Sequence, residues 1–219
     1  MSNPAAFFDL DLTLLTVNSG QLWMARERRL GRLSLRNTVE AFFKFAAYRL
    51  SIIDMEDAMR KALALYVGET EEDLDRWTRE WYAEEVAHTF APGGQPALQH
   101  HRDLGQPRVL LTSSSVYLSR EVQREMDLDD IICSRYEVGP DGCFTGEPVF
   151  PLCYGEGKVT LSERWAADND VDLDTSYFYT DSYTDLPMLE RVGQPRVVNP
   201  DMRLRRHARK HDWPILDWS

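Results

Sequence analysis

Two pairs of carboxylates in this sequence have a spacing that could support acid–base or metal chemistry. Asp9 and Asp11 follow one apolar run directly, and Asp181 and Asp185 follow another. Like charges held this close raise each other's pKa unless a cation or an acid–base role compensates for the repulsion. For Asp9 and Asp11 the alternative is a solvated turn after an edge strand, because an Asp-x-Asp motif is short.

Hydroxyl and amino groups follow other apolar segments. Thr112, Ser113 and Ser114 precede a predicted helix, whose N-terminal N–H groups could bind an anion together with these hydroxyls. Lys158 follows a Gly-Glu-Gly turn at the start of another predicted helix, where the helix dipole disfavours a cation. The alternatives are an ordinary N-cap for the hydroxyls and a surface position for the lysine. Because one sheet could bring all these segment ends together, we expect a single site.

Alternating strands and helices must position these groups. This alternation predicts a parallel sheet with helices on both faces, and ligands bind such sheets at the carboxyl ends of the strands. The predicted strands are Pro4–Leu10, Arg108–Thr112, a short one at Ile131 and Ile132, Ser176–Thr180 and Arg196–Asn199. The predicted helices are Val116–Met126, Lys158–Ala167, Leu186–Val192 and Leu204–His211.

A helical segment from about Ser19 to Phe90 interrupts this alternation. Apolar residues recur there at helical spacing, and Asp54 and Thr70 are plausible N-caps, each with an Asp three residues later. We therefore predict a helical cap domain over residues 17–90, inserted into an α/β core of residues 1–16 and 91–219. A Gly-Pro-Asp-Gly turn within Tyr136–Phe150 predicts two further short strands.

The sequence resembles the haloacid dehalogenase superfamily, and more narrowly its subfamily IB, the phosphoserine phosphatase-like branch. The resemblance covers nearly the whole chain, although the insertion matches only in position and length. It implies a three-layer α/β sandwich with a Rossmann-like parallel sheet and an inserted helical cap of the C1 type. The motifs that carry it are Asp9-Leu10-Asp11-Leu12-Thr13, Thr112 after Val-Leu-Leu, Lys158 after Gly155-Glu156-Gly157, Asp181-Ser182-Tyr183-Thr184-Asp185, and Val198-Asn199-Pro200-Asp201.

The resemblance implies a role for each residue of the first two motifs. Asp9 would be the nucleophile that forms an aspartyl-phosphate. Asp11 would protonate the leaving oxygen and then activate water; phosphatases of the family carry this second Asp, whereas its dehalogenases and ion pumps do not. Thr112, with the amides of Ser113 and Ser114, would hold phosphate oxygens.

The resemblance also implies a Mg²⁺ site. Asp181 would bind the ion together with the carboxylate of Asp9 and the backbone carbonyl of Asp11, an all-oxygen set that suits Mg²⁺. Lys158 would offset the negative charge of Asp9 and the phosphoryl group. Asp185 would orient Lys158 and the waters on the metal.

The sequence departs from the family pattern at three positions. Leu12 replaces a residue that is usually small, often Gly or Ser, and Thr112 replaces the usual Ser of this branch. Asn18 stands where phosphoserine phosphatases tend to have a Glu that receives the amino group of the substrate. Asn18 is therefore a candidate substrate-binding residue, and its neutrality argues against phosphoserine as the substrate.

The composition narrows the class of protein. The 219 residues include 25 Lys and Arg against 36 Asp and Glu, a net charge of -11, which disfavours non-specific binding to nucleic acid or to anionic lipid. No apolar run reaches the ~18 residues of a membrane-spanning helix, and the N-terminus lacks the features of a signal peptide. Three cysteines without a C-x-x-C pair suit a reducing compartment. We expect a cytoplasmic protein whose partner is a small phosphorylated substrate.

The expected function is Mg²⁺-dependent hydrolysis of a small phosphomonoester through an aspartyl-phosphate. Three alternatives remain open at this point. The protein could transfer the phosphoryl group to an alcohol. It could hydrolyse phosphoserine, or a lipid phosphate that contacts the apolar and aromatic segment Val39–Ile53. It could also be a non-catalytic phosphate-binding or interaction module on the same fold.

Overall fold

Six parallel strands form the central sheet. The computed structural model describes residues 3–32 and 55–219. The strands lie in the order β3-β2-β1-β6-β7-β8, and each neighbouring pair is parallel. Their bounds are β1 Ala6–Phe8, β2 Arg108–Ser115, β3 Asp130–Ser134, β6 Tyr177–Thr180, β7 Gln194–Val198 and β8 Ile215–Leu216. The predicted parallel sheet is confirmed, whereas the edge strand β8 is too short to leave a periodic signal in the sequence.

Strand β1 lies in the middle of the sheet, between β2 and β6. Phe8 of β1 pairs with Leu110 on one side and with Tyr179 on the other. The N–H of Asp9 then donates to the carbonyl of Tyr179 at 2.9 Å. The carboxyl ends of these three strands therefore meet at one edge of the sheet, where the alternation of elements predicts a ligand site.

Strand β2 is longer than its apolar pattern indicates. The prediction ends it at Thr112, but it continues to Ser115 because pairing with β3 resumes after a register shift: Thr112 pairs with Cys133, and Ser115 with Ser134. The next helix begins at Val116, as predicted, and the Ser115 hydroxyl accepts the N–H of Leu118 at 3.4 Å. The hydroxyl-rich run therefore lies at the end of a strand and not in a loop.

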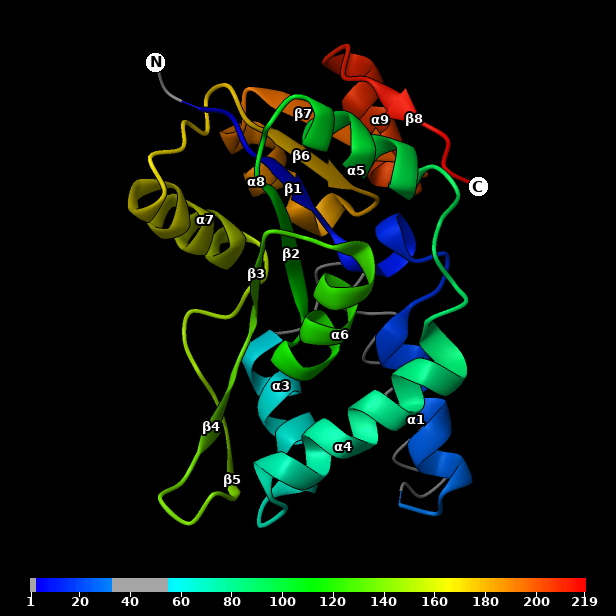
Figure 1. The fold of residues 1–219 in the computed structure, drawn as a ribbon, viewed down its shortest axis with the longest axis vertical. Helices are drawn as coiled ribbons and strands as arrows, with labels where there is room; N and C mark the ends of the chain where they lie inside the picture. Colours follow the sequence, from blue (N-terminus) through cyan, green and yellow to red (C-terminus); the bar gives the residue numbers. More distant parts are fainter. Residues whose placement is uncertain (1–2, 33–54) are drawn as a thin grey trace.

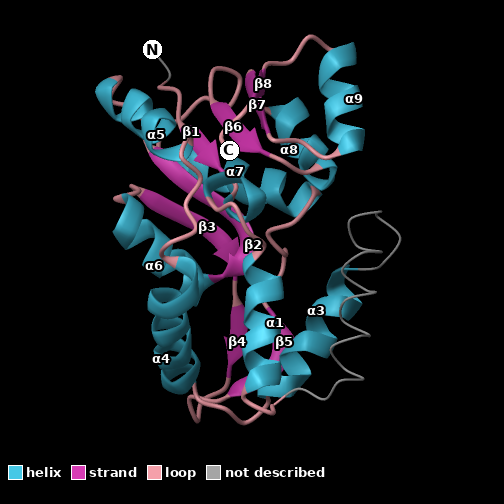
Figure 2. Ribbon diagram, turned by 90° about the vertical axis from the view of Figure 1, so that its right-hand side faces the viewer, coloured by secondary structure: helices cyan, strands magenta, loops and turns pink. Residues whose placement is uncertain are grey.

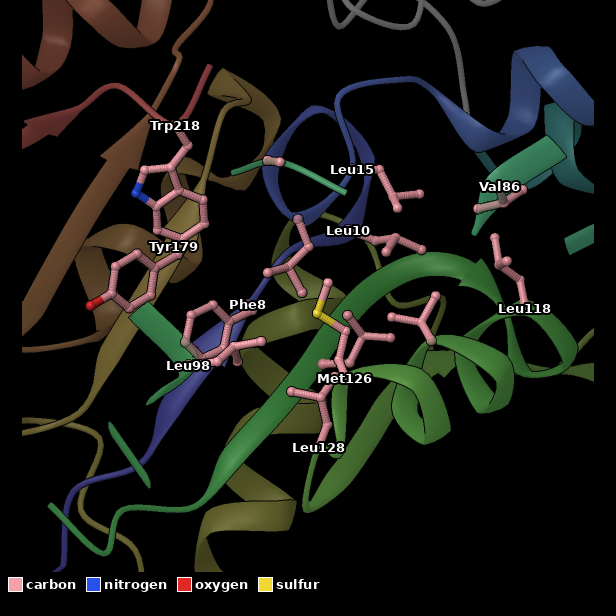
Figure 3. Packing of buried hydrophobic residues seen from close by; sticks show 14 of the residues in the cluster. Phe8, Leu10, Leu15, Val86, Leu98, Leu118, Met126, Leu128, Tyr179 and Trp218 are labelled. Carbon is pink, nitrogen blue, oxygen red and sulfur yellow. The ribbon is translucent and has the colours of Figure 1, made fainter. Parts of the chain in front are cut away.

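Helices cover both faces of the sheet, as predicted (Figure 2). Successive side chains of a strand point to opposite faces, so Phe8 packs in one buried cluster and Phe7 in the other. Figure 3 shows the first cluster, in which Phe8 and Tyr179 lie beside Trp218, near the C-terminus. The helices of the first face are α5 Gly94–Asp103 and α6 Val116–Met126; those of the second are α7 Glu156–Asp168, α8 Leu186–Arg191 and α9 Met202–Lys210.

The predicted helical insertion lies beyond the carboxyl ends of β1 and β2 (Figure 1). Thr70 is the N-cap of α4, as predicted, since its hydroxyl accepts the N–H of Asp73 at 3.1 Å. The predicted N-cap Asp54 and the apolar segment Val39–Ile53 both lie outside the described residues. Among the described helices, none has the length and apolarity needed to cross a bilayer. The insertion contains α1 Ser19–Arg29, α3 Met55–Leu63, α4 Glu71–Trp81 and the short helices Ala64–Tyr66 and Tyr82–Val86.

The predicted hairpin consists of β4 (Tyr136–Val138) and β5 (Phe144–Pro148), and it lies beside the insertion. Phe144 exchanges two backbone hydrogen bonds with this part of the chain: its carbonyl accepts the N–H of Gly68, and its N–H donates to Glu69. The hairpin, although distant in the sequence, is therefore hydrogen-bonded to the insertion and packs with it. The division of the chain at residues 16 and 91 stays a prediction.

The core makes a direct prediction for stability. Leu110 of β2 is fully buried, so Leu110→Ala should lower the free energy of unfolding by about 2–5 kcal/mol, because it removes apolar contacts and leaves a cavity. Chemical denaturation would measure this loss. The matched control is Leu104→Ala, because Leu104 is 54% exposed and its truncation should change stability by at most about 0.5 kcal/mol. Equal losses in the two variants would contradict this description of the core.

Candidate active site

Asp9 is the buried residue at the end of the central strand. Its carboxylate Oδ1 accepts a hydrogen bond from Lys158 Nζ at 2.8 Å. Burial raises the pKa of Asp9 to about 7; Lys158 opposes this effect, while Asp185 and Asp11 add to it. A carboxylate in this position needs a positive charge beside it to stay ionised at neutral pH.

Lys158 supplies one such charge from the first turn of α7. Its side chain is buried, and Nζ donates to Asp9 and also to Asp185 Oδ2 at 2.8 Å. Burial by itself would lower the pKa of Lys158, but the two carboxylates, Asp185 first, raise it above the ordinary value for lysine. Lys158 is therefore a buried ammonium and not the surface lysine of the alternative interpretation.

The close approach of α7 to the chain before it depends on Gly157. A Cβ at this position would lie 1.8 Å from the carbonyl oxygen of Leu152, so no other residue fits without a backbone shift. The glycine thus allows the backbone to bring the neighbouring Lys158 to the strand ends.

Asp11 lies in the turn between β1 and α1, and two groups at the start of α1 hold its carboxylate. Asn18 Nδ2 donates to Oδ2 at 3.1 Å, and the N–H of Ser19 donates to Oδ1 at 2.9 Å. Burial raises the pKa of Asp11, and the bonds from Ser19 oppose the rise. The next residue, Leu12, has φ 58°, in the left-handed region that favours glycine, which is one of the residues usual at this position.

The hydroxyl run at the end of β2 faces the same turn. Thr112 is buried, and its Oγ1 accepts the N–H of Ser114 at 3.2 Å. The hydroxyl of Ser114 lies 3.4 Å from that of Ser19, so the strand end meets the start of α1. The N–H of Ser114 already donates to Thr112. The expected contact of Ser114 with phosphate would therefore have to share this N–H or use the Ser114 hydroxyl.

The second acidic pair follows β6. Asp185 is buried and accepts Thr180 Oγ1 at 2.7 Å in addition to Lys158. Asp181 is buried too, and its carbonyl accepts the N–H of Asp201 at 3.0 Å. Asp201, which the sequence motif contains without a stated role, also accepts the N–H of Tyr183 at 2.9 Å and caps α9. It therefore fixes the loop that carries the acidic pair.

All nine residues predicted for the site line one cavity of about 580 Å³ between the sheet and the insertion. They are Asp9, Asp11, Asn18, Thr112, Ser113, Ser114, Lys158, Asp181 and Asp185. Asn18 also caps α1 by accepting the N–H of Gln21 at 3.0 Å, so its polar atoms contact Asp11 and the helix backbone; its expected contact with substrate stays a prediction. The sequence did not predict which residues form the opposite wall of the cavity. The helical periodicity of the insertion identifies buried helix faces, but it does not show which face meets the sheet.

Comparison with known proteins identifies the family. A family model described as haloacid dehalogenase-like hydrolase matches residues 6–190. The chain belongs to this family. Among its relatives are a histidinol-phosphatase of Neisseria meningitidis, 30% identical over 98% of both chains, and the phosphoserine phosphatase SerB1 of Mycobacterium tuberculosis, 32% identical over 98% of this chain and 70% of that one. This haloacid dehalogenase-like hydrolase is thus an enzyme of the phosphatase type.

Solved structures show the same fold. A protein of unknown function from Bordetella pertussis Tohama I matches this hydrolase with a TM-score of 0.88 and 26% identity over the full length of both chains. A phospho-aspartyl intermediate analogue of phosphoserine phosphatase matches with a TM-score of 0.73 and 17% identity, over 100% of this chain and 95% of that one. The predicted α/β fold with an inserted cap is confirmed.

The donors expected for Mg²⁺ fit an oxygen-coordinated cation. Asp9 and Asp181 directly follow the adjacent strands β1 and β6, and both line the cavity together with Asp11. The expected set combines two carboxylates with one backbone carbonyl, and oxygen donors of this kind are the ligands that Mg²⁺ prefers. The raised pKa of Asp9 is a further reason for a cation here, because a cation would stabilise the ionised carboxylate.

The buried ammonium makes a prediction for this hydrolase. Lys158→Met should lower the free energy of unfolding by about 3–5 kcal/mol near pH 8, because it leaves two buried carboxylates without their partner. Without the ammonium, the folded-state pKa of Asp9 rises further above its unfolded value. As the pH falls, Asp9 is therefore protonated in the folded variant before it is protonated in the unfolded chain. The loss of unfolding free energy should then be smaller near pH 5.5 than near pH 8.

Denaturation at the two pH values would measure this dependence. The control is Lys210→Met, because Lys210 is exposed at the end of α9 and should contribute at most about 0.5 kcal/mol. A loss for Lys158→Met that does not change with pH would contradict the electrostatic explanation.

Proposed function

We propose that this phosphatase hydrolyses small phosphomonoesters with Mg²⁺ as cofactor, through a covalent intermediate on Asp9. The observation that carries the proposal is the position of Asp9: it ends the central strand, lines the cavity and is bonded to the buried ammonium of Lys158. The phosphatase names of the relatives, and the structural likeness to an analogue of a phospho-aspartyl intermediate, support it.

In the first step, the Asp9 carboxylate attacks phosphorus and the ester oxygen leaves. Lys158 donates to Asp9 at 2.8 Å and so orients this carboxylate while offsetting the negative charge that gathers around it. Thr112, with Ser113 and Ser114, would hold the phosphate oxygens; all three residues lie at the end of β2 and line the cavity. Asp185 holds Lys158 from the other side.

Asp11 serves as the general acid and then as the general base. Its raised pKa favours the protonated form, which can donate a proton to the leaving alkoxide. After that transfer, the Asp11 carboxylate can take a proton from the water that attacks the phosphorus of the acyl phosphate on Asp9, which releases phosphate and the Asp9 carboxylate. The contacts from Asn18 and Ser19 hold Asp11 at the cavity throughout.

Mg²⁺ would be held by the carboxylates of Asp9 and Asp181 and the carbonyl of Asp11. When bound, it supplies positive charge that neutralises the phosphoryl oxygens and favours ionised Asp9. Asp201 supports this arrangement, since it bonds to the backbone of Asp181 and Tyr183 in the loop that carries the ligand.

The nucleophile can be tested directly. Asp9→Asn keeps the size of the side chain and an acceptor for Lys158, so the protein should fold, while hydrolysis of an aryl phosphate should fall by more than about 10³-fold. Chelation of Mg²⁺ should abolish activity in the unchanged protein, and added Mg²⁺ should restore it. Asp168→Asn, at an exposed position of α7, is the matched control and should leave activity unchanged. Full Mg²⁺-dependent activity in Asp9→Asn would refute the mechanism.

The role of Asp11 predicts a dependence on the leaving group. Asp11→Asn should lower kcat by about 10²–10⁴-fold for alkyl phosphates, whose alkoxide needs a proton as it leaves. The loss should be much smaller for nitrophenyl phosphate in the step that forms the acyl phosphate on Asp9, because nitrophenolate leaves without protonation. Single-turnover measurements of alcohol release would compare the two. Equal losses for the two substrates would show that Asp11 does not act as a general acid.

A further inference from the structure

Asn18 joins two parts of the site that belong to different elements. It lies at the start of α1, a helix of the insertion, and its side chain contacts Asp11, in the turn after β1. Both ends of its amide group are bonded: Oδ1 accepts the N–H of Gln21 at 3.0 Å, and Nδ2 donates to Asp11 Oδ2 at 3.1 Å. The side chain therefore links the backbone of α1 to the proposed general acid.

The helix cap determines which end of the amide meets Asp11. The first N–H groups of a helix need an acceptor, and within a side-chain amide only the oxygen can accept. Because Oδ1 of Asn18 accepts the N–H of Gln21, the amino group is directed to the carboxylate. The reverse orientation would place oxygen against oxygen at Asp11 and a donor against a donor at Gln21. The donor for Asp11 thus follows from the cap.

Two donors hold the carboxylate of Asp11, one at each oxygen. The N–H of Ser19 donates to Oδ1 at 2.9 Å, and Nδ2 of Asn18 donates to Oδ2. One bond alone would let the carboxylate rotate about that contact, whereas bonds to both oxygens fix its plane. Each oxygen can accept two hydrogen bonds, so room remains for the proton that Asp11 would transfer. A general acid needs this precision, because it must reach the leaving oxygen at hydrogen-bond distance.

Contacts within the insertion hold α1 itself. Trp23 of α1 donates from Nε1 to the hydroxyl of Tyr66 at 2.6 Å, in the short helix after α3. The ring of Trp23 also meets that of Trp81, in α4, edge to face with centroids 5.0 Å apart. The helix that Asn18 caps is thus joined to two other helices of the insertion. A residue that orients another group needs such a fixed support.

We infer that Asn18 is a positioning residue, which acts on the reaction only by orienting the carboxylate of Asp11 and not by contacting the substrate. This role differs from the contact with substrate that the sequence led us to expect. It accounts for the amide at this position: Asp or Ser would cap α1 about as well, but Asp has no donor and Ser has a shorter side chain. The inference rests on the proposed function, because it takes Asp11 as the general acid.

Two variants that keep the cap test the inference in single turnovers of phenethyl phosphate, an alkyl ester, with enzyme in excess. In Asn18→Ser the shorter side chain cannot reach Asp11, and in Asn18→Asp a second carboxylate repels it. The limiting rate of alcohol release should fall about 10–100-fold in Asn18→Ser, the effect of one hydrogen bond to a charged group, and at least as far in Asn18→Asp. The enzyme concentration that gives half of this rate should change by less than about 2-fold in Asn18→Ser, because substrate binding is unaffected.

The decisive comparison repeats Asn18→Ser in the Asp11→Asn background. If Asn18 acts only through Asp11, the second change should cost less than about 2-fold there, because no proton donor is left to orient. The rate of nitrophenolate release from nitrophenyl phosphate should likewise stay nearly unchanged in Asn18→Ser. A residue that binds the substrate would instead lower the rate by the same factor in both backgrounds and for both substrates, which would overturn the inference.

Stability measurements separate positioning from a weakened helix. Asn18→Ser should keep the Tm of the unchanged protein, because Ser caps helices about as well as Asn. The matched control is Gln21→Ala: its side chain is exposed and the cap uses its backbone N–H, so rates and Tm should stay unchanged. If Asn18→Ser does not fold, Asn18→Asp supports the same comparison in the Asp11→Asn background.

The inference and the proposed function can fail separately. If Asp11→Asn slows alcohol release from the alkyl phosphate but Asn18→Ser does not, the role of Asn18 is wrong and the proposed function stands. The same holds if Asn18→Ser raises the half-saturating concentration without changing the limiting rate. If Asp11→Asn slows alkyl and nitrophenyl phosphate equally, Asp11 is not the general acid, and the inference fails with that part of the proposed function.

Discussion

The site depends on one buried ammonium placed between two buried carboxylates. Lys158 donates to Asp9 and to Asp185, both at 2.8 Å, and all three side chains are nearly excluded from water. Burial of any one of these charges alone would be costly, because nothing in the protein interior replaces its hydration. With both carboxylates ionised, the three charges sum to one negative charge, which would favour the Mg²⁺ proposed for this edge of the sheet.

The rest of the architecture holds these three groups in place. The parallel pairing of β1 with β6 brings Asp9 beside the loop of Asp185, and Gly157 lets α7 approach closely enough for Lys158 to reach both. Helices on both faces bury the strands and exclude water from beneath the site. The fold thus uses apolar packing to make a strongly polar contact possible.

The residues of the sheet edge could be predicted from the sequence because each follows a short apolar strand, and strand ends converge in a parallel sheet. Other features left no comparable signal. Strand β8 has two residues, and the end of β2 continues through polar serines that look like a loop. The face of α4 that meets the cavity could not be predicted, because helical periodicity identifies a buried face without saying what lies against it. The contacts of the hairpin join segments about seventy residues apart, so local patterns could not reveal them.

These hairpin contacts affect how the insertion is mounted on the sheet. An insertion within one loop is tethered by two chain connections, one entering and one leaving. Here β4 and β5 leave the end of β3 and return to α7, and they are bonded to residues 68–71 of the insertion by backbone hydrogen bonds. Two more connections therefore join the insertion to the sheet. A hinge motion that opened the cavity would have to bend all four, like a lid held along two sides instead of one.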